Sequence, residues 1–229
     1  MSLFTFGKGL INKYPFLVFI TASIYNRIFG RNSFKIKGEN TIIGLNLSYL
    51  KKTKILIYGK NNVVDFGETC YLESSRVYIY GNNNKIILGK RIYAEGVDFH
   101  IEDNYNTLTI GDHTSFNGYT HLALTEGKNI TIGEDCMFAS NITVRTGDSH
   151  SIIEIDSKKR INEAKDVSIG EHVWLGNHTI ILKGVNIQPH SIIGSGSIVP
   201  VSFNEGYVAI AGNPAKIIKY GVDWKRERI

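Results

Sequence analysis

Histidine is the residue type in this chain best suited to acid–base chemistry, and His150 is the strongest candidate among the seven. It lies six residues after Val144, where the repeat described below expects an inward-facing aliphatic residue. A neutral imidazole can take a proton from a hydroxyl near neutral pH, so His150 is predicted to be a general base. His121 and His100 are the next candidates. The other histidines stand three residues after an aliphatic residue, an outward position that favours a surface role: His113, His172, His178 and His190.

A non-repetitive stretch follows His150 and runs to about Asp166. It contains three consecutive basic residues: Lys158, Lys159 and Arg160. Loops that leave a rigid scaffold commonly carry function, so a functional loop is expected at about residues 147–166. Within it, Asp148 either orients the imidazole or forms the turn after Gly147.

Neither cysteine is expected to act as a nucleophile. Cys70 and Cys136 stand four residues after Phe66 and Ile132, at the small inner position of the repeat. A buried thiol at such a site fills space and stays inert. Two cysteines do not make a disulfide framework, and no CxxC spacing of a metal site is present. A reducing compartment and no metal are therefore predicted.

The elements that position these residues are predicted from a repeat of 22 residues, here called the long repeat. Glycine recurs at this spacing: Gly67, Gly89, Gly111 and Gly133. The apolar residues three positions earlier keep the same spacing: Val64, Ile86, Leu108 and Ile130. A Gly-x-Asn-Asn motif occurs at residues 59–62 and 81–84, and both residue types tolerate the positive φ of a tight corner. A fainter copy near Phe34 marks where the repeats begin.

After the loop the repeat shortens to a hexad. Bulky aliphatic residues recur at this interval: Ile169, Leu175, Ile181, Ile187, Ile193 and Val199. Three such hexads make one triangular coil, and a short corner loop added to them gives the long repeat of the first half. Because one coil cannot bury its own aliphatic row, about seven coils are expected to stack into a parallel solenoid.

Composition favours an all-β chain in one elongated domain. The 229 residues include 23 Gly but only 4 Pro, with 42% hydrophobic and 21% charged residues. This balance excludes a disordered chain and a multi-span membrane protein, and the scarcity of alanine disfavours a helical bundle. We expect a basic, apolar helical segment at residues 1–33, the solenoid at residues 34–203 and a C-terminal tail at residues 204–229.

Part of the net charge of +5 is concentrated near the N-terminus. Lys8 and Lys13 precede an apolar stretch from Pro15 to Phe29, which is shorter than the roughly 20 residues that span a bilayer. No small-residue cleavage site follows, which disfavours a signal peptide. The stretch is predicted to be a helix that either packs on the solenoid or lies on an anionic membrane surface. The basic residues are not interleaved with aromatic ones on a platform, so no nucleic-acid partner is expected.

Several motifs resemble those of the hexapeptide-repeat acyltransferases: VRTGDSHSI, VSIGEHVWLGNHTIILKGV, SIIGSGSIV and AGNPAKIIK. The resemblance is greatest to the branch of galactoside and maltose acetyltransferases and of the O-acetyltransferases of capsule and O-antigen sugars. It implies a left-handed parallel β-helix, acetyl-CoA as donor and a saccharide hydroxyl of a bacterial surface polysaccharide or its precursor as acceptor. It also implies a cytoplasmic homotrimer whose donor site lies between adjacent helices.

The resemblance assigns residues to both substrates. The catalytic histidine of that branch stands at the start of the loop, where His150 stands. Trp174 is expected to line the acceptor pocket beside it, with Asn117 and Asp148 as polar candidates. Four residues match positions that contact CoA: Asn177, Ser195, Lys216 and Lys219. Lysine stands at both basic positions where arginine is common, which weakens bidentate contact with phosphate.

Other functions stay open on the sequence. N-acylation of an amino-sugar nucleotide uses the same histidine base and is the main alternative. A carbonic anhydrase on this fold would need three metal-binding histidines, two of them close in sequence, and no two histidines here are five residues apart. A non-enzymatic solenoid would have unbroken repeats and a uniform threonine-rich face, which this chain lacks. The sequence also leaves open the acyl group, the sugar and the hydroxyl.

Overall fold

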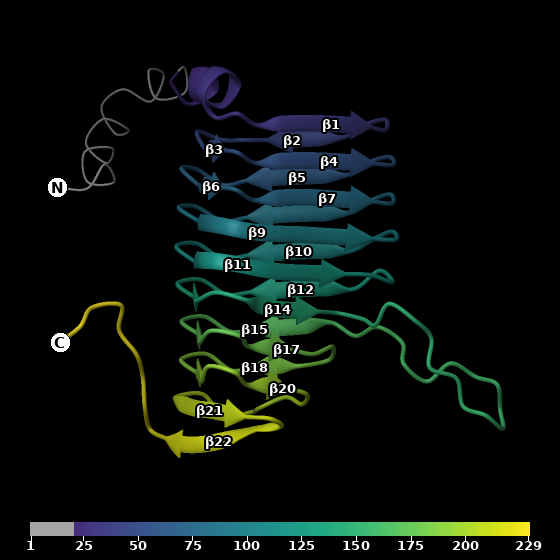
Figure 1. The fold of residues 1–229 in the computed structure, drawn as a ribbon, viewed down its shortest axis with the longest axis vertical. Helices are drawn as coiled ribbons and strands as arrows, with labels where there is room; N and C mark the ends of the chain where they lie inside the picture. Colours follow the sequence, from purple (N-terminus) through teal and green to yellow (C-terminus); the bar gives the residue numbers. More distant parts are fainter. Residues whose placement is uncertain (1–20) are drawn as a thin grey trace.

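The computed structural model describes residues 21–229, which form a left-handed parallel β-helix of about eight turns, one more than the repeats predict (Figure 1). The strands stack in one column, with β1 at one end and the C-terminal hairpin at the other. Buried aliphatic and aromatic side chains fill the interior from Leu50 to Ala215. The predicted all-β solenoid is therefore confirmed.

The strands form the three faces of the solenoid and belong to two sheets, parallel throughout except for the pairing of β21 with β22. The first face consists of β1 (Ser33–Lys37), β4 (Lys54–Tyr58), β7 (Arg76–Tyr80), the second halves of β9 (Tyr93–Glu102) and β11 (Ser115–Leu124), β14 (Ile142–Arg145), β17 (Ile180–Ile181) and β20 (Ile198–Val199). The second face consists of β2 (Ile42–Gly44), β5 (Val63–Phe66), β8 (Lys85–Leu88), β10 (Thr107–Ile110), β12 (Asn129–Ile132), β15 (Val167–Ile169) and β18 (Asn186–Ile187).

The third face begins with β3 (Tyr49–Lys51) and β6 (Tyr71–Glu73) and continues through the first halves of β9 and β11. It ends with β13 (Met137–Phe138), β16 (Trp174–Leu175), β19 (Ile192–Ile193), β21 (Val208–Gly212) and β22 (Ala215–Tyr220). Because β9 and β11 each run around the corner between the third and first faces, these two strands join the two faces into one sheet.

The parallel pairing confirms both repeat lengths. Val64 pairs with Ile86, one long repeat further along the chain, and Ile169 pairs with Ile187, three hexads further along. Each pair places two buried aliphatic side chains in adjacent coils, so stacking of the coils builds the core. The loop at residues 147–166 is inserted between β14 and β15, and both strands still pair with the neighbouring coils.

The Gly-x-Asn-Asn corners adopt the backbone conformation that their residues predict. Gly59 and Gly81 have φ values of 118° and 149°. The last asparagine of each corner is buried and stacks on the next: the backbone N–H of Asn84 donates to Oδ1 of Asn62 (3.0 Å), and that of Asn106 to Oδ1 of Asn84 (2.9 Å). These bonds satisfy backbone groups that the corner would otherwise leave unpaired.

The N-terminal segment packs on the first coil in the part that the structure describes. Residues 21–24 are helical, and η1 (Tyr25–Phe29) continues them as a π-helix. Asn26 is buried, donates from Nδ2 to the carbonyl of Ser48 (2.8 Å) and accepts the backbone N–H of Leu50 (2.7 Å). In the described part of the chain, no helix is long and apolar enough to cross a bilayer. The start of the predicted helix lies outside the described residues: Lys8, Lys13 and Pro15.

Residues 204–229, predicted as a tail, contain the antiparallel hairpin of β21 and β22. The segment after it, residues 221–229, is here called the C-terminal strap, and it runs back along the solenoid (Figure 1). Trp224 stacks on His172 with ring centroids 4.3 Å apart and donates from Nε1 to the carbonyl of His172 (2.8 Å). Arg226 forms an ion pair with Asp135 at 3.0 Å. The strap therefore covers one corner of the solenoid.

Candidate active site

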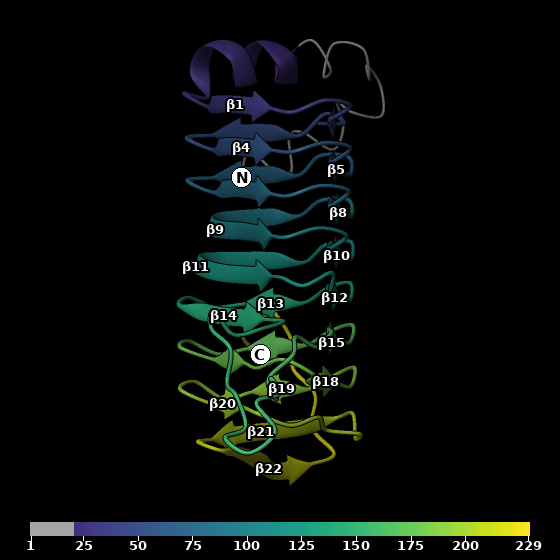
Figure 2. The ribbon, with the colours of Figure 1, turned by 90° about the vertical axis from the view of Figure 1, so that its right-hand side faces the viewer.

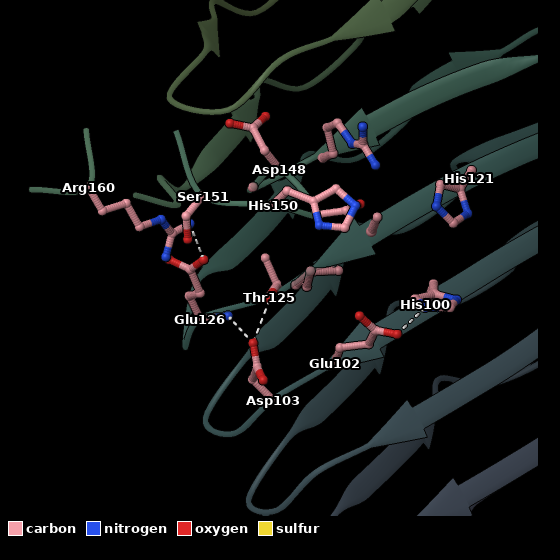
Figure 3. Close-up of a pocket in the computed structure, with 15 residues that line it drawn as sticks. His100, Glu102, Asp103, His121, Thr125, Glu126, Asp148, His150, Ser151 and Arg160 are labelled. Atoms are coloured by element: carbon pink, nitrogen blue, oxygen red, sulfur yellow. Dashed lines mark hydrogen bonds and ion pairs between the residues drawn. The ribbon is translucent and has the colours of Figure 1, made fainter. Parts of the chain in front are cut away.

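A groove of about 440 Å³ lies where the first face meets the loop that follows β14. Its floor comes from the second halves of β9 and β11, and its wall from residues 147–151 and Arg160 (Figure 3). The loop projects away from the solenoid (Figure 1) and extends along its long axis to the level of the C-terminal coils (Figure 2). The groove is lined by three histidines: His100, His121 and His150.

His150 is exposed at this groove, at the point where the hexad pattern of the sequence breaks. Strand β14 ends at Arg145 and the chain leaves the coil at the buried Gly147, so the hexad count ends before His150. Asn162 holds the backbone at this point by donating from Nδ2 to the carbonyl of His150 (2.8 Å). The imidazole itself has no hydrogen-bond partner among residues 21–229. It is therefore open to a substrate.

Asp148 interacts with the loop and the following coil. Its Oδ2 accepts hydrogen bonds from Nζ of Lys183 (2.6 Å) and Nδ2 of Asn162 (2.8 Å), and Lys183 also donates to the carbonyl of Asn162 (2.8 Å). The hydrogen bond from Lys183 lowers the pKa of Asp148. We call Asp148, Asn162 and Lys183 the loop clamp, because they join both ends of the loop to the solenoid. The sequence does not reveal Lys183 or Asn162 as partners, since their approach depends on how the loop folds.

Glu126 provides a second attachment for the loop. Its carboxylate accepts a hydrogen bond from Nη2 of Arg160 (2.5 Å) and another from the backbone N–H of Ala164 (3.1 Å). The hydrogen bond from Arg160 is the main cause that lowers the pKa of Glu126. The basic residue of the predicted loop that lines the groove therefore holds the loop in place.

A ladder of paired polar residues on the first face adjoins the groove. Asp98 accepts hydrogen bonds from Arg76 at 2.7 and 2.6 Å, and its Oδ2 lies 3.1 Å from Nδ1 of His121. Burial alone would raise the pKa of Asp98, but His121 and Arg76 outweigh burial and hold that pKa well below its usual range. Nε2 of His100 lies 3.2 Å from Glu102. Both histidines of the ladder are therefore engaged by carboxylates.

Trp174 and Asn117 lie on the third face. Trp174, on β16, is 37% exposed, and its ring centroid lies 6.3 Å from that of Trp224 in the C-terminal strap. Asn117, in the first half of β11, donates from Nδ2 to the carbonyl of Phe138 (3.3 Å). Neither residue lines the groove that contains His150. One chain therefore does not bring these two predicted acceptor residues to the predicted base.

Asn177 and Ser195 lie near the corner between the third and first faces. Oδ1 of Asn177 accepts hydrogen bonds from the backbone N–H and the hydroxyl of Ser140, both at 3.0 Å. A Cβ at Gly176 would lie 2.7 Å from the backbone nitrogen of Ser195, so the coils approach too closely for any side chain at that glycine. The corner thus offers a flat backbone surface with polar side chains beside it.

Lys216 and Lys219 are exposed on β22, at the C-terminal end of the solenoid. Neither lysine has an ion-pair partner in the part of the chain that the structure describes. Neither lines the groove of His150. Their positive charge is therefore available to an anionic ligand at this end of the molecule.

Both cysteines are buried and free, as the repeat predicts. Burial raises the pKa of the Cys70 thiol to about 11 and that of Cys136 to about 12. A thiol that stays protonated and inaccessible does not attack a substrate. The filler role predicted for both residues is confirmed.

Among residues 21–229, one group of possible metal ligands comprises His172, His190 and Asp223, whose ligand atoms lie within 4.8 Å of one another. These atoms already have partners in the chain. Nδ1 of His172 lies 2.7 Å from Asp135 and its Nε2 lies 3.1 Å from the carbonyl of Trp224, while Nδ1 of His190 lies 3.2 Å from Asp223. The group therefore fastens the C-terminal strap to the solenoid.

No family model matches the chain. The chain is 34% identical over 199 residues to the polysialic acid O-acetyltransferase of Neisseria meningitidis, covering 86% of this chain and 92% of that protein. It is 43% identical over 103 residues to the polysialic acid O-acetyltransferase of Escherichia coli O1:K1, but that match spans only 45% of this chain and 33% of the relative. The crystal structure of the polysialic acid O-acetyltransferase OatWY superposes with a TM-score of 0.81 at 34% identity, covering 86% of this chain and 92% of that one. The chain therefore belongs to the hexapeptide-repeat acetyltransferases, the family that its motifs predict.

Proposed function

We propose that the protein transfers the acetyl group of acetyl-CoA to a sugar hydroxyl of a bacterial surface polysaccharide or its precursor, with His150 as general base. The observation that carries this proposal is the free imidazole of His150 in a groove next to the loop clamp, which attaches the loop to the solenoid. The acceptor hydroxyl binds in the groove, and polysialic acid, the substrate named for two of the relatives, is the first acceptor to test.

The proposed reaction is a direct transfer. One ring nitrogen of His150 takes the hydroxyl proton as the sugar oxygen attacks the thioester carbonyl. Backbone amides stabilise the oxyanion that forms. The carbon–sulfur bond then breaks, and the imidazolium returns its proton to the CoA thiolate. The burial of Cys70 and Cys136 supports a mechanism without an acetyl-cysteine.

The donor is proposed to lie along the corner between the third and first faces. Gly176 carries no side chain at this corner, and Asn177 and Ser195 supply polar contacts for the pantetheine arm. Lys216 and Lys219 are exposed at the end of the solenoid, where they would meet the CoA phosphates as point charges.

The active unit is proposed to be a homotrimer in which each site lies between two copies. Trp174 lies outside the groove of its own chain, so it would reach an acceptor only from a neighbouring copy. The loop supports this arrangement, because it projects from the solenoid with four exposed isoleucines: Ile152, Ile153, Ile155 and Ile161. Ile155 alone is 80% exposed, and contact with a second copy would remove such apolar surface from water.

We further propose a cytoplasmic enzyme that contacts the inner membrane surface through its N-terminal segment. The described part of that segment leaves Ile28 and Phe29 each 65% exposed beside the basic residue Arg27. Exposed apolar side chains next to positive charge suit a surface of anionic lipid.

Incubation with acetyl-CoA and candidate acceptors, followed by mass and NMR analysis of the products, tests the function. Sialic acid oligomers and neutral capsule sugars test O-acetylation, and an amino-sugar nucleotide tests the N-acylation alternative. Release of CoA with a new ester on a sugar supports the proposal. Amide formation on the amino sugar alone, with no ester on any saccharide, contradicts it.

A further inference from the structure

The groove of His150 also contains one arginine without a partner. Arg145, the last residue of β14, lines the groove. Among the described residues its side chain forms no ion pair and no hydrogen bond, and its Nε is buried without an acceptor. The terminal Nη groups are not among the buried unpaired atoms and have no partner in the described residues, so they are the donors that remain available to solvent or to a bound ligand.

The carboxylates of the groove are already engaged within the chain. Asp103 accepts hydrogen bonds from the hydroxyl of Thr125 (2.6 Å) and from the backbone N–H of Glu126 (3.2 Å). The other carboxylates have the partners described above: Glu102, Glu126 and Asp148. The charge of Arg145 acts on Asp148, yet the hydrogen bonds of that carboxylate go to the loop clamp. Arg145 is therefore left available to an external anion.

Among the described residues, the other basic side chains that line the groove, except His150, are also paired within the chain, which leaves Arg145 as the unpaired cation. Arg160 is held by Glu126, and the ladder histidines are held by Glu102 and Asp98. Of the titratable side chains that line the groove, Arg145 and His150 are the two that have no partner in residues 21–229. One carries a fixed positive charge and the other can accept a proton.

We propose that Arg145 binds the carboxylate of an acidic sugar, so that the groove selects sialic or uronic acid residues as acceptors. This inference rests on the proposed function. A guanidinium presents paired N–H donors that match both oxygens of a carboxylate. With its carboxylate on Arg145 and a hydroxyl at His150, the sugar ring is held at two points in one groove. A neutral sugar makes only one of these contacts.

Kinetics with matched acceptors test this assignment in the full chain. The acceptors are an α2,8-linked sialic acid oligomer, the same oligomer with its carboxylates converted to amides, and an oligoglucuronate. The variants are Arg145→Gln, which removes the charge, and Arg145→Lys, which keeps the charge but not the fork. Arg91→Gln is the matched control, because Arg91 is exposed at the corner between β8 and β9, away from the groove.

We expect the wild-type protein to prefer an acidic acceptor over the amide by about tenfold to a hundredfold in kcat/KM, the range of a charge-assisted hydrogen bond. Arg145→Gln should lose most of this preference through a higher KM, Arg145→Lys should retain part of it, and Arg91→Gln should keep all of it. Whichever acidic oligomer gives the higher kcat/KM identifies the source of the carboxylate. Equal use of acid and amide by the wild type, or full preference in Arg145→Gln, overturns the assignment.

Calorimetric titration of the same oligomers separates failure of this inference from failure of the proposed function. If no acceptor is acetylated, the proposed function fails, while weaker binding of the sialic acid oligomer by Arg145→Gln still supports the role of Arg145. If acetylation occurs but binding is the same in both proteins, the function stands and the role of Arg145 is wrong. Thermal unfolding of both variants confirms that the fold is intact.

Discussion

Lys183 and Asp148 form an ion pair of 2.6 Å that connects the coil after the loop to the beginning of the loop itself. Asn162 bridges this pair to the backbone carbonyl of His150. The contact therefore fixes the point at which the proposed base leaves the solenoid. We therefore propose that Asp148 positions His150 through the backbone and does not contact the imidazole directly.

Lys183→Met should lower kcat by about tenfold to a hundredfold, because a shift of about 1 Å in a catalytic group has effects of this size. The core strands do not depend on this pair, so the melting temperature should change little. Lys85→Met, an exposed lysine on β8 of the second face, is the control and should leave kcat unchanged. Unaltered kcat in Lys183→Met would show that the loop clamp does not position His150.

Asp98 should make stability depend on pH. Its pKa in the folded state is held below the usual value by His121 and Arg76, against the opposing effect of burial. A lowered pKa means that the contribution to stability is complete above about pH 4, the ordinary Asp value, and is lost as pH falls through the lower folded-state pKa. Asp98→Asn should therefore be less stable than wild type at pH 7 by ~1–3 kcal/mol. Denaturant unfolding of wild type and Asp98→Asn at pH 7 and at pH 3 measures the difference in their free energies of unfolding at each pH. A larger difference at pH 3 than at pH 7 would contradict this explanation.

The sequence predicted the solenoid well because its coils are periodic. The spacing from Val64 to Ile86 and from Ile169 to Ile187 equals the observed pairing register. The same spacing also pairs Arg76 with Asp98, which lie one long repeat apart and in register.

The contacts of the loop and the strap could not be predicted in this way. Asp148 meets Lys183, 35 residues away, only because the inserted loop folds back on the next coil. Trp224 meets His172 across 52 residues with no repeat to set the register. The broken hexad at His150 marks where the chain leaves its coil, but the repeat predicts no contact beyond that point.

Mixing two inactive variants tests the shared site. Light scattering of the wild-type protein should give the mass of three chains. In activity assays, His150→Ala and Trp174→Ala should each be inactive when tested alone. If a site joins His150 to Trp174 of the partner subunit, randomly mixed trimers should recover about one quarter of the wild-type sites, since each site then needs one intact residue from each of two chains. An active monomer, or mixed trimers without recovery, would show that each chain holds a complete site.

Vesicle flotation tests the proposed membrane contact. Full-length protein should bind anionic vesicles weakly, with ~1 kcal/mol from each basic residue near the surface, and should dissociate as salt is raised. Replacing Ile28 and Phe29 with Asp should abolish binding. Val201→Asp changes an exposed apolar residue near the other end of the solenoid and should bind as wild type does. If wild type, the variant with Asp at positions 28 and 29, and Val201→Asp all float equally with the vesicles, the membrane contact does not involve Ile28 and Phe29.

The turnover number of His150→Ala with the identified acceptor tests most directly whether His150 is the general base. We expect kcat to fall by ~10²–10⁴-fold, the usual contribution of a general base, with acetyl-CoA affinity and melting temperature unchanged. His113→Asn, at an outward histidine of the repeat, should keep full turnover. Near-normal kcat in His150→Ala would contradict the account and would direct attention to His121 and His100 on the floor of the same groove.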